Sequence, residues 1–318
     1  MKKIKSVCLP ALLFFLLALA GAIVAERVVA QEQQPPQQTA NQTTPPTWTA
    51  SIDQIRRVAA LIPGPRPLRI NMLKFAESRR TKDVSVQGAP AEPSVQARTV
   101  FQVVYSDGAV MIDSGMDETI HKLLGRGAVE PYFPDAAQQV NQALRRAKVI
   151  VMTHEHGDHV AGVVRPPLAE ELAPKTVLTR TQIETLLTSP QFPEIKLTPE
   201  MARHYIMIDY DRYYPFAPGM ALIKAPGHTP GSQMIYVVLA SGKEYLFVGD
   251  AAWLMDNIRL LRGKNAPFLA EDAKTVMDEL RWLHALLDAE KNLVIVVSHD
   301  DEEHRQLIAN HLLGDHLE

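Results

Sequence analysis

The chain has 318 residues, of which 46% are hydrophobic and 22% charged, with a formal net charge of −3 at pH 7. This length allows one large domain or two small ones, and either would bury a sizeable hydrophobic core. Because the charge is slightly acidic and no basic run occurs, the sequence argues against a nucleic acid as partner.

The first 30 residues have the layout of a secretory signal peptide. Three lysines in MKKIK precede an uncharged apolar run from Leu9 to Ala25, and Val28 and Ala30 are small residues placed as a cleavage signal requires. We therefore expect residues 1–30 to be cleaved and the protein to be periplasmic or secreted. If this segment is not cleaved, its apolar run is at the lower limit for crossing a bilayer, and the protein is anchored in the inner membrane.

The only cysteine, Cys8, lies inside this segment. A mature chain without it has no thiol, which excludes disulfides, thiolate metal ligands and a cysteine nucleophile. Residues 31–50 are rich in Gln, Pro and Thr and contain few apolar residues, so we expect them to form a disordered tether. Residues 51–318 are predicted to form one α/β domain.

Within 51–318, predicted helices and strands follow one another with short turns. Ser51 and Gln54 have the spacing of a capping box at the start of an amphipathic helix over 51–62. The pattern then predicts a β-hairpin over 97–105 and 109–113, strands over 148–153, 175–179, 221–226, 233–240, 244–250 and 292–300, and helices over 136–147, 181–187, 274–289 and 302–313. Clusters of strands separated by helices indicate an α/β domain of layered sheets.

An unusual group of histidines follows one of these strands, in the segment IVMTHEHGDHVAG at 150–162. His154, His156, Asp158 and His159 fall within six consecutive positions of a chain that has 11 histidines in all. All four side chains are common metal ligands, and the glycines give the backbone the freedom that a tight ligand loop needs. The alternative is a surface loop that is rich in histidine by chance.

Three further residues of the ligand type stand directly after predicted strands. His228 follows 221–226, Asp250 ends the strand 244–250, and His299 follows the apolar run LVIVVS. Taken one at a time, they could be a turn histidine and two helix caps. Because strand ends at one rim of a sheet point to a common place, we expect these residues to converge with the histidine cluster.

With these motifs in place, the sequence resembles the metallo-β-lactamase fold superfamily over roughly residues 66–313. HEHGDHVAG fits the signature HxHxDHxxG of that superfamily at every fixed position. The turn MIDSG at 111–115, PGHTPGS around His228, VGD ending at Asp250 and SHD at His299 support the resemblance. It implies an α/β fold of the αββα type, in which two mixed β-sheets are flanked by helices and the metals lie in a groove at the sheet edge.

The resemblance also implies a site for two divalent metal ions, of which zinc suits imidazole and carboxylate ligands best and iron or manganese also fit. Such a pair generates a hydroxide that attacks a carbonyl, while Asp158 and Asp250 lower the net charge of the site and take up a proton as catalytic groups. By position in the motifs, one ion is held by His154, His156 and His228, the second by Asp158, His159 and His299, and Asp250 bridges the two.

The residue at position 250 narrows the substrate class that the resemblance implies. In the β-lactamases of the superfamily this position is usually Cys or Ser, whereas an Asp matches the lactonase, glyoxalase II and phosphodiesterase branches. Trp253 departs from many acyl-homoserine lactonases, which have a Tyr there, because an indole N–H donates a hydrogen bond but carries no proton. We therefore expect a small-molecule lactone, ester or thioester as substrate, with β-lactam hydrolysis, phosphodiester hydrolysis or an inactive metal-binding scaffold as alternatives.

Two segments outside the metal signature are candidate walls of the substrate pocket. The segment HYIMIDYDRYYPFAPG at 204–219 contains four tyrosines and one phenylalanine between prolines. Its alternative role is a loop that covers the core. GRGAVEPYFPDA at 125–136 is the second candidate.

Overall fold

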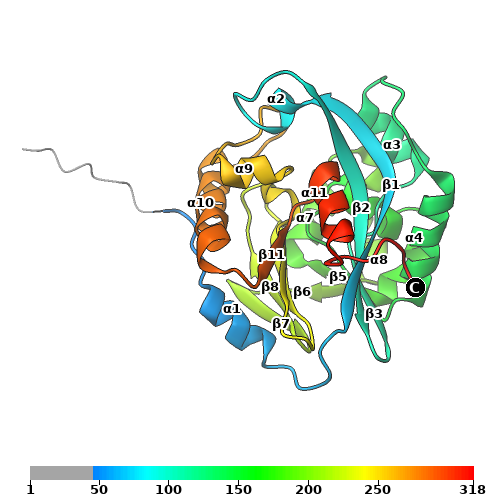
Figure 1. Ribbon diagram of the computed structural model, residues 1–318. Helices are drawn as coiled ribbons and strands as arrows, with labels where there is room; N and C mark the ends of the chain where they lie inside the picture. The colour runs from blue at the N-terminus through cyan, green and yellow to red at the C-terminus, as the bar shows by residue number, and fades with distance from the viewer. Residues whose placement is uncertain (1–45) are drawn as a thin grey trace, which may run out of the picture. The chain divides into compact units, whose positions relative to one another are not determined.

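Two β-sheets stacked face to face form the centre of the computed structural model, which describes residues 46–318 (Figure 1). The first sheet has the order β1 (Arg69–Thr81), β2 (Pro93–Tyr105), β3 (Gly108–Ile112), β4 (Val149–Val151), β5 (Thr176–Thr179), β6 (Ile206–Ile208). The second has the order β11 (Leu293–Val296), β10 (Glu244–Phe247), β9 (Gln233–Val238), β8 (Met220–Lys224), β7 (Tyr213–Ala217). Both are mixed, since β3 to β6 and the β10–β11 pair are parallel and the other pairs antiparallel.

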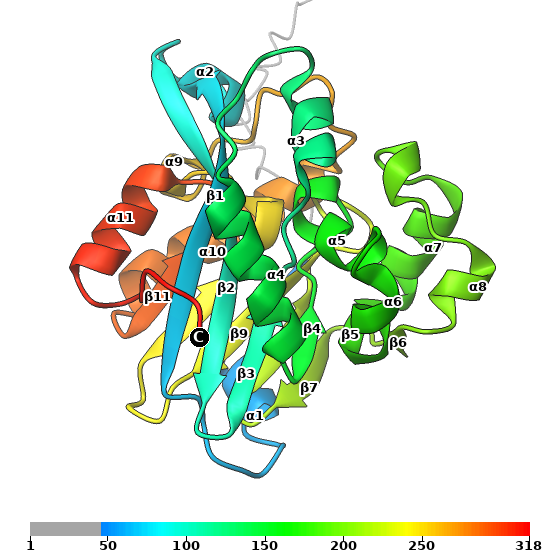
Figure 2. The same ribbon diagram turned by 90° about the vertical axis from the view of Figure 1, so that its right-hand side faces the viewer.

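Helices cover the outer face of each sheet, as Figure 2 shows for the first sheet. The first sheet is covered by α3 (Glu118–Gly125), α4 (Pro134–Arg146), α5 (Gly157–Val164), α6 (Ala169–Leu172), α7 (Arg180–Thr188) and α8 (Pro199–Ala202). The second is covered by α1 (Ile52–Ala59), α9 (Met255–Arg259) and α10 (Ala273–Ala289), while α2 (Lys82–Ser85) contacts β1 and α11 (Asp301–Ala309) contacts β2. The predicted αββα architecture is confirmed.

The alternation of side chains along the central strands produces these layers. In β9, Met234 and Tyr236 are buried in the cluster that includes α1 and α10, whereas Ile235 and Val237 are buried between the two sheets. Side chains of a strand point alternately to its two faces, so a strand that is covered on both faces is apolar throughout. Each fully buried side chain of this kind contributes about 1.5–3 kcal/mol.

The N-terminal edge of the packed region differs from the prediction. Trp48 lies within the predicted tether 31–50, yet its indole N–H donates to the carbonyl oxygen of Lys224 at 2.7 Å and its ring meets that of Trp282 edge to face at 5.5 Å. The backbone N–H of Thr47 donates to Asp278 at 2.6 Å. A tryptophan has a large apolar ring and one hydrogen-bond donor, so it can pack against the domain even from a polar segment. The last residues of the predicted tether are therefore packed against α10.

The predicted signal peptide 1–30 and tether residues 31–45 lie outside the described residues. Over 46–318, none of the helices combines the length and the apolar character needed to cross a bilayer.

Several elements were not predicted from the sequence, and three regions of the chain illustrate this. Strand β1 alternates charged and apolar residues in part and pairs with β2 through a bulge near Lys74. The predicted histidine loop contains the helix α5, which begins at Gly157. The segment 204–219 contains the short edge strands β6 and β7 instead of a covering loop.

Candidate metal centre

The ends of four strands carry ligand-type side chains to one place. His154 follows β4 of the first sheet, and His228, Asp250 and His299 follow β8, β10 and β11 of the second. The candidate site therefore lies at the edge of the two stacked sheets at which these four strands end. All four side chains are buried, with 0–4% of their surface exposed.

The remaining ligands come from the start of α5. His156 is the N-cap residue of this helix, and Asp158 and His159 lie in its first turn. The helix approaches the turn after β3 so closely that a Cβ atom at Gly162 would lie 2.3 Å from the carbonyl oxygen of Ser114. The last glycine of the HxHxDHxxG signature is therefore required by packing, because any side chain would push α5 and its two ligands away.

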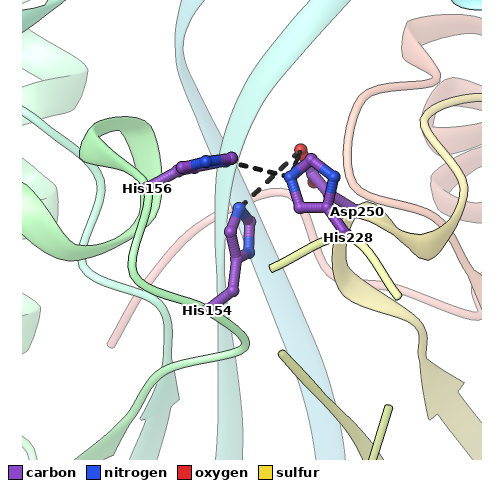
Figure 3. Close-up of side chains that lie close together, drawn as sticks. All are labelled: His154, His156, His228 and Asp250. Atoms are coloured by element: carbon purple, nitrogen blue, oxygen red, sulfur yellow. Dashed lines mark hydrogen bonds and ion pairs between the residues drawn. The ribbon is translucent and has the colours of Figure 1, made fainter. Parts of the chain in front are cut away.

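Four of the predicted residues form a first group, shown in Figure 3. His156 Nδ1 lies 2.9 Å from His228 Nε2. Asp250 Oδ2 lies 3.4 Å from His228 Nε2 and 3.8 Å from His154 Nε2. The ligand atoms of this group all lie within 4.8 Å of one another.

Asp158, His159 and His299 form a second group next to the first. Asp158 Oδ2 lies 3.5 Å from His159 Nε2 and 3.6 Å from His299 Nε2. The other oxygen of Asp250, Oδ1, lies 3.4 Å from His159 Nε2 and 3.2 Å from His299 Nε2. Oδ2 also lies 3.3 Å from His299 Nε2. The carboxylate of Asp250 thus lies between the two groups, which is the position a bridging carboxylate needs.

The donor atoms fit two divalent cations. Ligands about 2.0–2.1 Å from a tetrahedral zinc ion are separated by about 3.4 Å, close to the spacings in both groups. Within residues 46–318, His154 Nε2, His159 Nε2 and Asp250 Oδ1 are buried without a hydrogen-bond partner. Buried polar atoms of native proteins are normally paired, so these three atoms are the ones expected to bind a metal ion. Imidazole and carboxylate donors suit zinc, and iron or manganese as well.

The electrostatics of the site favour the ligating forms of most of these side chains. Burial, reinforced by neighbouring imidazoles, lowers the pKa of His156 to about 3 and that of His154 well below its usual value. Burial is the largest effect on Asp158 and raises its pKa, but Arg98, His159 and His299 together outweigh burial and hold the pKa of this carboxyl well below its usual range. Burial also raises the pKa of Asp250, but the imidazoles of His299, His159 and His154 outweigh it and hold this pKa well below its usual range. Neutral imidazoles and ionised carboxylates are the forms that bind metal.

His159 is the exception in the metal-free protein. Burial lowers its pKa, but the carboxylates of Asp158, Asp113 and Asp250 outweigh burial and raise the pKa well above its usual value. A metal ion that binds here therefore displaces a proton from this ring.

Hydrogen bonds at Nδ1, the ring nitrogen that points away from the site, fix the orientation of His159 and His299. His159 Nδ1 lies 2.8 Å from Asp113 Oδ2, and Asp113 in turn accepts the backbone N–H of Thr153 at 2.6 Å. His299 Nδ1 donates to the carbonyl oxygen of Ala97 at 2.8 Å. Such partners leave Nε2 facing the site and raise the basicity of the ligand.

The loop before α10 provides a second set of supporting residues. Glu271 pairs with His228 Nδ1 and with Lys264 Nζ, the latter at 2.8 Å. Lys264 is almost fully buried and also donates to the carbonyl oxygen of Asp250 at 2.6 Å. Trp253 donates its indole N–H to Asp250 Oδ2 at 2.7 Å.

Most of these supporting residues were not predicted from the sequence. Asp113 had a visible signal, because it stands in MIDSG at the end of β3. Arg98 had a weaker one, a single charge inside the apolar run of β2. Lys264 and Glu271 had none, because they come from a loop without regular spacing.

A small cavity of about 40 Å³ adjoins the site. It is lined by Arg80, Gln96, Arg98, Leu124, Arg126, His156, Asp158, Gln191, Asp250, Trp253, Phe268 and Leu269. The predicted wall 204–219 contributes nothing to this lining, so that prediction is wrong. Its tyrosines have structural partners instead: the hydroxyl of Tyr205 donates to the carbonyl oxygen of Val163 at 2.8 Å. The second predicted wall, 125–136, contributes Arg126.

Comparisons with known proteins agree with this geometry. The family model described as "Metallo-beta-lactamase superfamily" matches residues 95–299. Among curated relatives, an N-acyl homoserine lactonase of a Bacillus species is 24% identical over 216 residues, which cover 63% of this chain and 79% of the relative. The N-acyl homoserine lactonase AiiA of Bacillus thuringiensis subsp. kurstaki has the same identity and coverage.

Solved structures share the fold. A quorum-quenching N-acyl homoserine lactone lactonase superposes with a TM-score of 0.60 and 17% identity over 76% of this chain and 95% of the other. AidC, a dizinc quorum-quenching lactonase, superposes with a TM-score of 0.55 and 15% identity over 75% of this chain and 91% of the other. The family match spans well over half of the chain and includes all seven residues of the two ligand groups. The chain therefore belongs to the metallo-β-lactamase superfamily, as a metal-dependent hydrolase.

Proposed function

We propose that this hydrolase opens a lactone ring or cleaves a related carboxylic ester or thioester, with zinc as the metal in both groups. The observation that carries the proposal is the position of the Asp250 carboxylate between the two ligand groups, beside a cavity whose lining includes apolar residues. The curated relatives are named N-acyl homoserine lactonases, which makes an N-acyl homoserine lactone the first substrate to test.

Two divalent ions held by these residues would supply Lewis acidity, which lowers the pKa of water and polarises the carbonyl oxygen of a substrate. The chain itself holds the ligands in place: Trp253 orients Asp250, and Asp113 orients His159. The alkoxide that leaves when the ester bond breaks needs a proton, and the attacking water has one to give up. We assign the transfer of this proton to Asp250, because its carboxylate lies between the two ligand groups, where the attacked carbonyl would be held.

The lining of the cavity has the character that an acyl chain requires. Leu124, Phe268 and Leu269 line it together with Arg126, whose guanidinium stacks over the Phe268 ring at 3.5 Å. A cavity of about 40 Å³ holds little more than water, so Arg126 and Phe268 have to separate to admit a substrate. Two larger cavities, of about 460 and 420 Å³, contain none of the seven ligands and are not proposed as substrate sites.

The decisive experiment measures ring opening of N-hexanoyl and N-decanoyl homoserine lactone by the zinc-loaded protein, next to 4-nitrophenyl butyrate, a butyryl thioester, a carbapenem and bis-4-nitrophenyl phosphate. We expect a kcat/KM of about 10⁴ M⁻¹s⁻¹ or more for at least one lactone, far slower turnover of the carbapenem and the phosphodiester, and loss of activity on chelation. Asp250→Asn should fold but lose nearly all turnover. Efficient hydrolysis of the carbapenem with inert lactones, esters and thioesters would contradict the proposal.

We further propose that the protein is exported and acts in the periplasm or outside the cell. The support is the sequence of residues 1–30, with its basic start, apolar centre and small-residue exit. Expression of the full chain followed by fractionation and N-terminal sequencing tests this. A mature N-terminus near residue 31 supports cleavage, an intact chain in the inner membrane supports anchoring, and an intact chain in the cytoplasm contradicts export.

A further inference from the structure

Arg98 places a positive charge directly against the second ligand group. This residue lies in β2, and only 8% of its side chain is exposed. Its Nη1 donates to Asp158 Oδ2 and lies 3.2 Å from His299 Nε2, while Nη2 donates to Ser78 Oγ at 2.9 Å. The guanidinium thus contacts two of the three ligands of the second group, and Ser78 holds it from behind.

Among residues 46–318, no cationic side chain contacts a ligating atom of the first group in the same way. The buried cation Lys264 is paired with Glu271 and donates to the backbone carbonyl oxygen of Asp250, not to a ligating atom. The charge of Lys264 is therefore balanced by a carboxylate outside the ligand set. The charge of Arg98 is balanced by Asp158, which is itself a ligand.

This difference gives the two groups different affinities for a divalent cation. The oxygen that Arg98 contacts, Asp158 Oδ2, is the one that faces His159 and His299. An ion in the second group has to draw that oxygen away from the guanidinium and is repelled by its charge across a few ångströms of buried space. Attraction and repulsion between charges are least screened in such a buried region.

We propose that Arg98 competes with the metal ion of the second group, so that the two sites fill in a fixed order. The group of His154, His156 and His228 fills first, and Arg98 supplies the second positive charge as long as only one ion is bound. Arg98 is thus a positioning residue that holds Asp158 in place before the second ion arrives. The inference rests on the dinuclear site of the proposed function, but not on the identity of the substrate.

The test is a titration of the metal-free protein with zinc, in which a chromophoric chelator competes for the ion and yields both dissociation constants. Arg98→Gln removes the charge and keeps a donor for Asp158. We expect it to tighten the second site by about tenfold or more, the scale on which residues behind metal ligands act, and to leave the first site within about threefold. Arg126→Gln is the matched control. Arg126 lines the same cavity, but among the described residues it has no contact with the ligands, so this variant should alter neither dissociation constant.

The sign of the effect separates competition from a structural role. If Arg98 served only to hold the fold, its replacement would weaken the second site, and an unchanged or weaker second site in Arg98→Gln overturns the proposal. Circular dichroism and thermal melting verify that the variant is folded.

A second measurement on the unaltered protein applies if the variant does not fold. Crystals with one and with two equivalents of zinc, located by anomalous scattering, should show the first ion beside His154 and His228 with Arg98 still on Asp158. The second equivalent should occupy the other group, with the guanidinium moved away from Asp158 Oδ2. A first ion in the group of Asp158 overturns the inference. Failure to hydrolyse lactones, esters or thioesters with both ions bound contradicts only the proposed function.

Discussion

Glu279 in α10 provides a direct test of the electrostatics around the site. Burial raises the pKa of this carboxyl to about 8, against the opposing effects of the Gly227 N–H, which donates to it at 3.0 Å, and of the Lys264 charge; Glu271 and Asp272 raise it further. Since the folded state holds the proton more tightly than the unfolded chain, the free energy of unfolding falls as pH rises from about 4.5 to about 8. A shift of this size corresponds to a cost of about 3–5 kcal/mol above pH 8.

Glu279→Gln is isosteric with the protonated side chain and removes this cost. We expect the variant to match the unaltered protein near pH 4.5 and to exceed its free energy of unfolding by up to about 3–5 kcal/mol at pH 8.5. Urea denaturation of both proteins at each pH gives the difference, in which effects common to both cancel. Asp288→Asn, an exposed carboxylate in the same helix, is the matched control and should change stability by less than about 0.5 kcal/mol. A variant that is equally stable or less stable at pH 8.5 would refute the reasoning.

Three further predictions concern the site and its access. Trp253→Phe removes the hydrogen bond to Asp250 and should lower kcat about tenfold or more and weaken zinc binding with little change in KM; an unchanged kcat would show that the bond is dispensable. Gly162→Ala should lower the free energy of unfolding by about 1–3 kcal/mol in urea, because its methyl group meets a backbone carbonyl, while Gly263→Ala, in open space, should not. Phe268→Ala should raise KM for N-decanoyl homoserine lactone about tenfold and leave the N-butyryl lactone unaffected; equal effects on both would contradict an acyl-binding lining.

The candidate ligands could be identified in the sequence because each is marked by its immediate neighbours. His154, His228, Asp250 and His299 stand at or just after an apolar run that ends in a turn, and the structure brings all of them to one edge. Periodicity identifies a buried strand, and the layered architecture directs strand ends to a common rim. The division into two groups came from the resemblance and not from spacing, and the distances in the structure agree with it.

The supporting residues were not predictable because their roles depend on contacts distant in sequence. Arg98 reaches Asp158 from 60 residues away, and Glu271 reaches His228 from 43. A charge inside a strand or loop has no local pattern that identifies its partner. Only the three-dimensional packing shows that these charges end behind metal ligands instead of in solvent.

The predicted tyrosine wall failed for a different physical reason. Tyrosines between prolines are typical of binding loops, because a ring offers apolar area together with a polar hydroxyl. The same properties suit the edge of a sheet, where Tyr213 accepts the N–H of Ser51 at 2.8 Å and so fixes the start of α1. Composition alone does not distinguish these two uses. Phe268 and Leu124, which do line the cavity, lie in segments with no aromatic cluster.

Trp253 is a position at which the sequence departs from the pattern of the resemblance, and the structure shows which group this side chain contacts. An indole has one donor, and here it is directed to Asp250 Oδ2 in a buried position. A donor committed to the carboxylate that faces both ligand groups is not free to orient a substrate carbonyl, so Trp253 has only apolar ring atoms to offer the cavity that it lines. The residue at this position therefore acts on the metal ligands first and on the substrate only through apolar contact. Substrate orientation must come from other polar residues of the lining, such as Gln191 and Arg126.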